Sequence, residues 1–85
     1  MSKETLAAFG PILRRLRRER ELTQERLSEL VGVASPYICM LESGRKCPNL
    51  DMLFRLAEAL DVRPGAIVDA MQAEASPEGK PPFLC

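Results

Sequence analysis

Few side chains in this sequence can carry out acid–base or metal chemistry. There is no histidine, the commonest general base and zinc ligand in proteins. The three cysteines, Cys39, Cys47 and Cys85, show no C-x-x-C spacing, and no glycine-rich phosphate loop is present. We therefore predict no catalytic residue, no metal site and no cofactor, and we do not expect an enzyme.

The remaining reactive groups are charged side chains, which are unevenly distributed along the chain. Twelve lysines and arginines balance twelve aspartates and glutamates over 85 residues. Residues 1–47 carry nine basic and six acidic side chains, whereas residues 48–85 carry three basic and six acidic ones. A neutral chain with one basic face can bind an anionic polymer. The charge pattern thus permits a nucleic-acid partner without requiring one.

A chain of this length forms one small domain, and the spacing of its apolar residues predicts helices. The first helix is predicted over residues 6–16, where five apolar side chains share one face. These are Leu6, Phe9, Ile12, Leu13 and Leu16. Pro11 lies within the segment, so the helix either kinks there or begins at Gly10, just before the proline.

The second helix is predicted over residues 24–31. Thr23 can accept a hydrogen bond from a free amide at its start, and Gly32 can end it in the left-handed conformation.

The third helix follows after a tight turn. Ser35 and Pro36 predict its start, with Ser35 as the cap, and the helix runs to about Ser43, where Gly44 ends it. Two helices joined by so few residues cross steeply, which is the helix-turn-helix arrangement.

Two more helices and a tail complete the chain. Asn49 can cap the fourth helix, and Pro64 can open the fifth. The fourth helix has one face that we expect to be buried, formed by Leu50, Leu53, Leu56, Ala57 and Leu60. From residue 74 the sequence is rich in proline and polar residues. We therefore predict a domain over residues 1–73 and a flexible Pro-rich tail over residues 74–85.

A combination of these features carries a family resemblance. It comprises a Thr-Gln helix entry, a turn glycine, a Leu-Glu-x-Gly exit and two trailing helices. Its residues are Gly10, Arg17, Leu22-Thr23-Gln24-Glu25, Leu27, Gly32-Val33, Tyr37-Ile38, Leu41-Glu42-Ser43-Gly44-Arg45 and Pro48. Over residues 9–72 the chain resembles the lambda-repressor-like (Xre/Cro) helix-turn-helix family. The resemblance implies an all-α, five-helix domain that binds operator DNA as a dimer, with the third helix in the major groove.

The resemblance also implies roles for individual residues. Gln24 matches the position that hydrogen-bonds a DNA phosphate. Arg17 and Glu42 match an ion pair that orients the third helix. Arg45 and Lys46 follow that helix, where basic side chains can contact the phosphate backbone.

The outward face of the third helix carries the residues expected to contact DNA bases: Ser35, Pro36, Cys39, Met40 and Ser43. None is an arginine, lysine, asparagine or glutamine, the side chains that bind a base through two hydrogen bonds. We therefore expect modest base discrimination. The same composition suits contact with protein, so the alternative is a protein-interaction module or an antitoxin-like partner with this fold.

The leading interpretation is a sequence-specific DNA-binding transcriptional regulator that represses by occupying a promoter. Its partner is double-stranded DNA. A homodimer is expected through Ile67, Val68 and Met71, because the fifth helix has little core left to cover. No apolar segment is long enough to span a membrane and no signal peptide is evident, so we expect a cytoplasmic protein.

Overall fold

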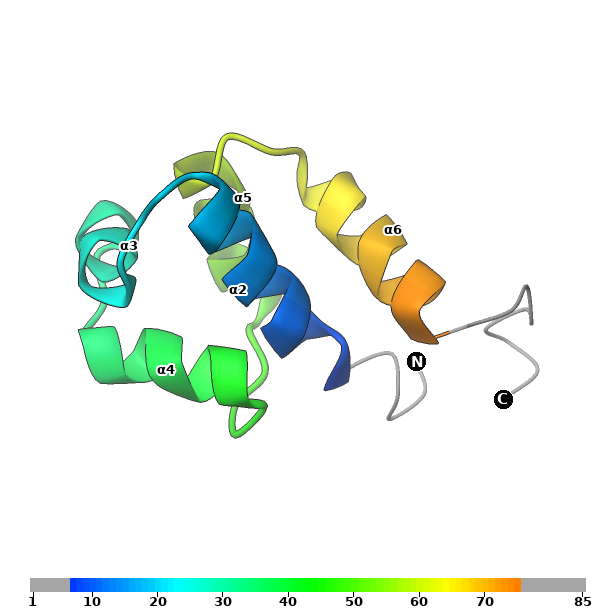
Figure 1. The fold of residues 1–85 in the computed structure, drawn as a ribbon, viewed down its shortest axis with the longest axis horizontal. Coiled ribbons are helices and arrows are strands. Elements are labelled where there is room, and N and C mark those ends of the chain that lie inside the picture. The colour runs from blue at the N-terminus through cyan, green and yellow to red at the C-terminus, as the bar shows by residue number, and fades with distance from the viewer. Residues whose placement is uncertain (1–6, 76–85) are drawn as a thin grey trace.

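The computed structural model describes residues 7–75, which form helices and no strand (Figure 1). In chain order the helices are α2 (Phe9–Glu19), α3 (Gln24–Val31), α4 (Ser35–Ser43), α5 (Leu50–Ala59) and α6 (Pro64–Ala75). Figure 1 shows α3 and α4 together at one end of the molecule and α6 at the other. The expected all-α fold is confirmed for the described residues. None of these five helices is long and apolar enough to cross a membrane.

The start of α2 explains how the helix accommodates its proline. The helix begins at Phe9, so Pro11 lies in its first turn, where backbone amides have no intrahelical partner. Of the two alternatives, a start beside Gly10 is therefore the one observed. The helix also continues to Glu19, beyond the predicted end at residue 16. Leu6 lies outside the described residues.

The second predicted helix is confirmed with its bounds, as α3. The Thr23 hydroxyl oxygen accepts a hydrogen bond from the Arg26 amide at 2.9 Å. Gly32 ends the helix with a φ of 87°, a left-handed conformation that glycine adopts without a Cβ clash.

The start of α4 corrects one prediction. Its cap residue is Ala34, with extended backbone, and Ser35 is the first helical residue and makes no capping hydrogen bond. Pro36 is tolerated next to it because its missing amide would have no partner in the first turn. The end of the helix is as predicted, since Gly44 has a φ of 83° and the Arg45 amide donates to the Met40 carbonyl at 2.9 Å.

Helices α5 and α6 complete the described fold. The Asn49 side chain caps α5 by accepting from the Met52 amide at 2.7 Å. Leu50 was expected to be buried but is 75% exposed, because it is the first residue of α5 and points away from the core. Helix α6 continues to Ala75, past the predicted domain boundary at residue 73. The remainder of the predicted tail, residues 76–85, lies outside the described residues.

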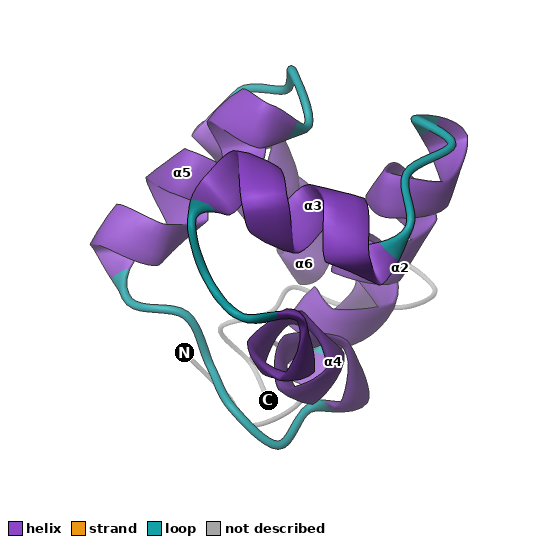
Figure 2. Cartoon of the chain, turned by 90° about the vertical axis from the view of Figure 1, so that its left-hand side faces the viewer, coloured by secondary structure: helices purple, strands orange, loops and turns teal. Residues whose placement is uncertain are grey.

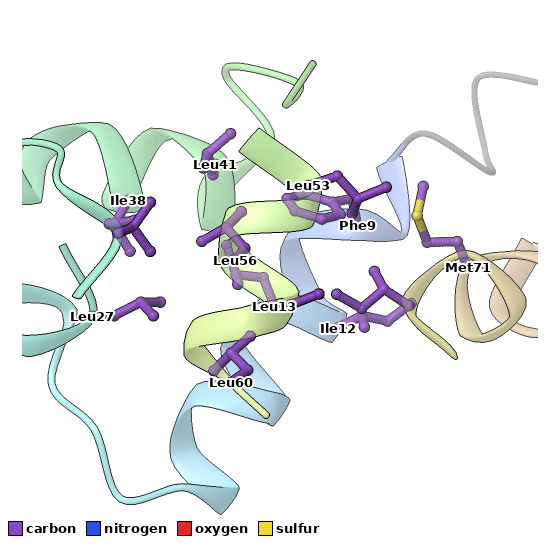
Figure 3. Packing of buried hydrophobic residues seen from close by; sticks show 13 residues of the cluster. Phe9, Ile12, Leu13, Leu27, Ile38, Leu41, Leu53, Leu56, Leu60 and Met71 are labelled. Carbon is purple, nitrogen blue, oxygen red and sulfur yellow. The ribbon is translucent and has the colours of Figure 1, made fainter. Parts of the chain in front are cut away.

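A single apolar core joins all five helices. Its members are Phe9, Ile12, Leu13, Leu27, Val31, Ile38, Leu41, Leu53, Leu56, Ala57, Leu60, Ile67 and Met71 (Figure 3). Ile67 is 1% exposed and Met71 is 5% exposed. Both side chains therefore cover their own subunit's core, so Ile67 cannot form the predicted dimer surface and Met71 reaches the surface only at the edge of a hollow. Only Val68 of the predicted trio is partly exposed.

Helices α2 and α4 approach each other closely at Gly10. A Cβ atom built on this glycine would lie 2.9 Å from the Leu41 carbonyl oxygen and closer still to that of Glu42. Because both oxygens belong to backbone, they cannot rotate away as a side chain can. The absence of a side chain at Gly10 therefore sets the distance between α2 and α4.

Candidate nucleic-acid interface

Helix α4 is anchored along one side and open along the other. Ile38 and Leu41 are completely buried, and Glu42 is 4% exposed. These residues attach α4 to α2 and α3, the helices it packs against. Figure 2 shows α4 almost end-on while α3 runs across the view, which is the steep crossing that the sequence predicted.

The opposite side of α4 is the outward stripe, defined as Ser35, Pro36, Cys39, Met40 and Ser43. Pro36, Cys39 and Ser43 are exposed, while Ser35 and Met40 are half-buried. The Ser43 hydroxyl donates to the Met40 carbonyl at 3.2 Å. The outward stripe therefore presents small and apolar side chains to solvent, because no other described segment covers the whole of it.

A charged network on the buried side fixes the orientation of α4. The Nε atom of Arg17 donates to Glu42 Oε2 at 2.6 Å, and its Nη2 atom donates to Glu42 Oε1 at 3.1 Å. The Nη1 atom of Arg17 donates to the Leu22 carbonyl at 2.7 Å. The predicted ion pair between Arg17 and Glu42 is therefore present as a two-point contact, and Arg17 joins α2 to α4 and to the segment before α3.

The environment of Glu42 favours its charged form. Burial alone would raise the pKa of this carboxyl group. Hydrogen bonds from Arg17 and Gln24, the positive charge of Arg17 and a hydrogen bond from Arg14 together outweigh it, so the pKa of Glu42 lies below its ordinary value of 4.5. Glu42 is thus ionised at neutral pH, as the two-point contact with Arg17 requires.

Two members of this network were not foreseen from the sequence. Gln24, expected at a DNA phosphate, donates from Nε2 to Glu42 Oε1 at 3.1 Å. An amide group carries two hydrogens, so one remains to contact a phosphate. Arg14 donates from Nε to the same Glu42 oxygen at 3.3 Å. Its position three residues before Arg17 was the available signal, since such residues are neighbours on a helix.

Arg45 and Lys46 lie in the segment after α4 and both are exposed. Their backbone amides both donate to the Met40 carbonyl, at 2.9 and 3.3 Å. These amides are therefore used to end α4. Their charged side chains remain available to contact an anionic partner.

Comparison with known proteins identifies the class to which this fold and surface belong. Residues 13–67 match the family model for the helix-turn-helix, HTH_3. The chain belongs to this lambda-repressor-like (Xre) helix-turn-helix family of DNA-binding transcription regulators, which is not an enzyme family.

Two relatives are named as transcriptional regulators. The chain is 43% identical over 53 residues to y4dJ of Sinorhizobium fredii, named an uncharacterized HTH-type transcriptional regulator, covering 62% of this chain and 69% of that protein. A protein of Methanothermobacter thermautotrophicus, also named an uncharacterized HTH-type transcriptional regulator, is 47% identical over 49 residues. The match covers 58% of this chain and 71% of that protein.

Two solved structures share the fold. The restriction-modification controller protein C.AhdI of Aeromonas hydrophila aligns with a TM-score of 0.70 and 37% identity, covering 73% of this chain and 94% of that one. The clp gene regulator ClgR of Corynebacterium glutamicum aligns with a TM-score of 0.75 and 27% identity. The alignment covers 79% of this chain and 71% of that one.

Proposed function

We propose that this protein is a sequence-specific regulator that represses transcription in the cytoplasm by occupying promoter DNA, with α4 in the major groove. The supporting observation is the two-sided environment of α4. Its inner residues Ile38, Leu41 and Glu42 are buried, and its outward stripe is open. A helix enters the major groove only if it projects from the domain while its inner side is rigidly supported.

The proposal divides the surface residues into two groups. Gln24, Arg45 and Lys46 contact phosphates and position the domain. The outward stripe contacts base edges through the hydroxyl groups of Ser35 and Ser43 and the apolar side chain of Met40. Because the stripe has no side chain that binds a base through two hydrogen bonds, each such missing contact forgoes about 1–3 kcal/mol of discrimination. DNA shape then contributes a larger share of the specificity.

Selection of bound fragments from random duplex DNA tests this proposal and yields the preferred sequence. With that duplex in hand, Arg45→Ala is expected to weaken binding to the selected and to unrelated sequences by the same factor. Met40→Ala should instead change the ratio between the affinity for the selected sequence and the affinity for unrelated sequences. Equal losses on all sequences for Met40→Ala would remove its proposed role, and recovery of no enriched sequence would contradict sequence-specific binding.

A homodimer remains part of the proposal, on a surface that includes Val68 and Met71 of the three predicted residues and adds residues of α5. Leu50 is 75% exposed and Phe54 is 58% exposed, and they stand four residues apart on one side of α5. Beside them is an apolar hollow of about 480 Å³, lined by Phe9, Cys47, Pro48, Asn49, Leu50, Leu53, Val68 and Met71. A projecting apolar pair next to an apolar hollow is self-complementary under a two-fold axis. We infer that a second copy of this chain covers this surface.

The dimer is tested by sedimentation of Phe54→Lys beside the wild-type protein. The wild type is expected to sediment as a dimer at high micromolar concentration, and the variant as a monomer, because a lysine at the contact centre leaves a charge without a partner. The control is Leu30→Lys, an exposed apolar residue on α3, which should leave the dimer intact. A wild-type monomer at that concentration would contradict the dimer.

The alternative, a protein-interaction module, is favoured by the apolar character of the outward stripe. Salt dependence separates the two functions. Binding to DNA phosphates weakens steeply as salt rises, whereas an apolar protein contact does not.

A further inference from the structure

The outer face of α2 carries a group of arginines that the proposed interface does not use. Arg14, Arg15 and Arg18 line a surface hollow of about 430 Å³ together with Pro11 and Glu19. Arg17, on the same helix, points inward and is neutralised by Glu42. The outer face of α2 is therefore positively charged even though the whole chain has no net charge.

Arg14 and Arg18 have charge available for a ligand. Arg14 uses its Nε atom to contact Glu42, and its side chain is still 46% exposed. Arg18 is exposed and makes no ion pair or side-chain hydrogen bond with any described residue. In contrast, three exposed arginines elsewhere are each paired with a carboxylate. These are Arg20 with Asp61, Arg26 with Glu29 and Arg55 with Asp51.

These arginines continue the proposed phosphate-contacting surface. Lys46 lines a hollow with Phe9 and Gly10, so it lies beside the start of α2. Arg14 follows one turn along the helix, where it contacts α4 through Glu42. Arg18 lies a further turn along, about 6 Å from Arg14 along the helix axis. Lys46 and Arg14 thus both lie where α2 meets α4, and Arg18 extends the basic outer face of α2 by one turn from that junction.

We propose that Arg14 and Arg18 form a second phosphate-binding strip, which contacts the DNA backbone next to the groove that α4 occupies. The inference rests on the proposed function, because its ligand is the same duplex. The strip contacts phosphates and no bases, so it contributes affinity that does not depend on sequence. It also compensates for the few base contacts that the outward stripe can make.

The strip predicts a specific change in the salt dependence of DNA binding. Each phosphate contact adds about 0.9 to the slope of log affinity against log salt. Arg18→Gln is therefore expected to make this slope shallower by about 0.9. At 0.1 M salt the affinity should fall about eightfold, because the release of counterions at one phosphate contributes about that factor. The loss should be equal on the selected duplex and on a 20-base-pair duplex of random sequence. Arg14→Gln should reduce the slope by the same amount.

Two control variants isolate the strip from general charge effects. Arg63→Gln makes the same change in charge on the connection between α5 and α6, which Figure 1 places on the far side of the molecule from α4. This control should keep the full slope. Arg18→Lys should also keep it, because a lysine retains the positive charge. Thermal unfolding checks that each variant folds as the wild type does.

The possible outcomes distinguish this inference from the function on which it rests. If the wild type binds DNA with a steep salt dependence but Arg18→Gln and Arg14→Gln keep its full slope, the strip is overturned and the proposed function stands. If Arg63→Gln loses as much slope as Arg18→Gln, the effect is general charge and the strip is likewise overturned. If the wild type binds no duplex at low salt, both proposals fail.

Discussion

Gly10→Ala is expected to lower the free energy of unfolding by about 2–3 kcal/mol, toward the upper end of the penalty for overpacking a core. The added Cβ atom would lie 2.9 Å from the Leu41 carbonyl oxygen and closer to that of Glu42. Relief requires α2 and α4 to move apart, which also lengthens the contact between Arg17 and Glu42. In a helix without this contact the same substitution stabilises, because alanine loses less backbone entropy than glycine on folding. Denaturant unfolding measures the difference.

Gly65→Ala is the matched control for this substitution. Gly65 lies in the first turn of α6, and a Cβ atom there would meet nothing within 4 Å. This variant should be as stable as the wild type or more stable by up to about 1 kcal/mol. Equal unfolding free energies for the two variants would show that the close approach of α2 and α4 does not limit stability.

Features that depend on neighbouring residues in the sequence could be predicted. Thr23, Gly32, Gly44 and Asn49 act through the backbone within a few residues of themselves, and each does what its side chain chemistry or its lack of Cβ predicts. Ser35 is the exception, and the reason is again the local backbone conformation. A cap requires extended backbone at its own position, and here Ala34 has it.

Features that depend on packing between distant segments could not be predicted. A stripe on α6 shows that Ile67 and Met71 share an apolar face, but not whether the same subunit or a second copy covers that face. The hydrogen-bond network around Glu42 also depends on packing between distant segments. The family resemblance supplied Arg17, whereas Arg14 and Gln24 join only because three helices bring their side chains to one carboxylate. For Arg14 the spacing of three residues from Arg17 was the one available signal, whereas Gln24 had no such signal in the sequence.

Glu42→Gln is the substitution with the largest expected effect, a loss of about 3–5 kcal/mol of unfolding free energy at pH 7. The variant keeps the shape of the side chain but removes its charge. Arg17, with only 11% of its side chain exposed, is then left as a buried cation without its partner. Glu29→Gln is the matched control, because it breaks an exposed ion pair with Arg26. Exposed pairs of this kind contribute about 0.5 kcal/mol or less.

The pH dependence of stability gives this prediction a second readout. The pKa of Glu42 is lower in the folded protein than its ordinary value of 4.5, so below that pH the unfolded chain takes up a proton that the folded one does not. The stability contributed by Glu42 is thus complete above about pH 4.5, and it is lost as the pH falls through the lower pKa of the folded state. The difference between wild type and Glu42→Gln should shrink over this range, whereas Glu29→Gln should show little change. A difference that stays constant down to pH 2 would mean that the stabilising contact is steric and that the charge of Glu42 does not orient α4.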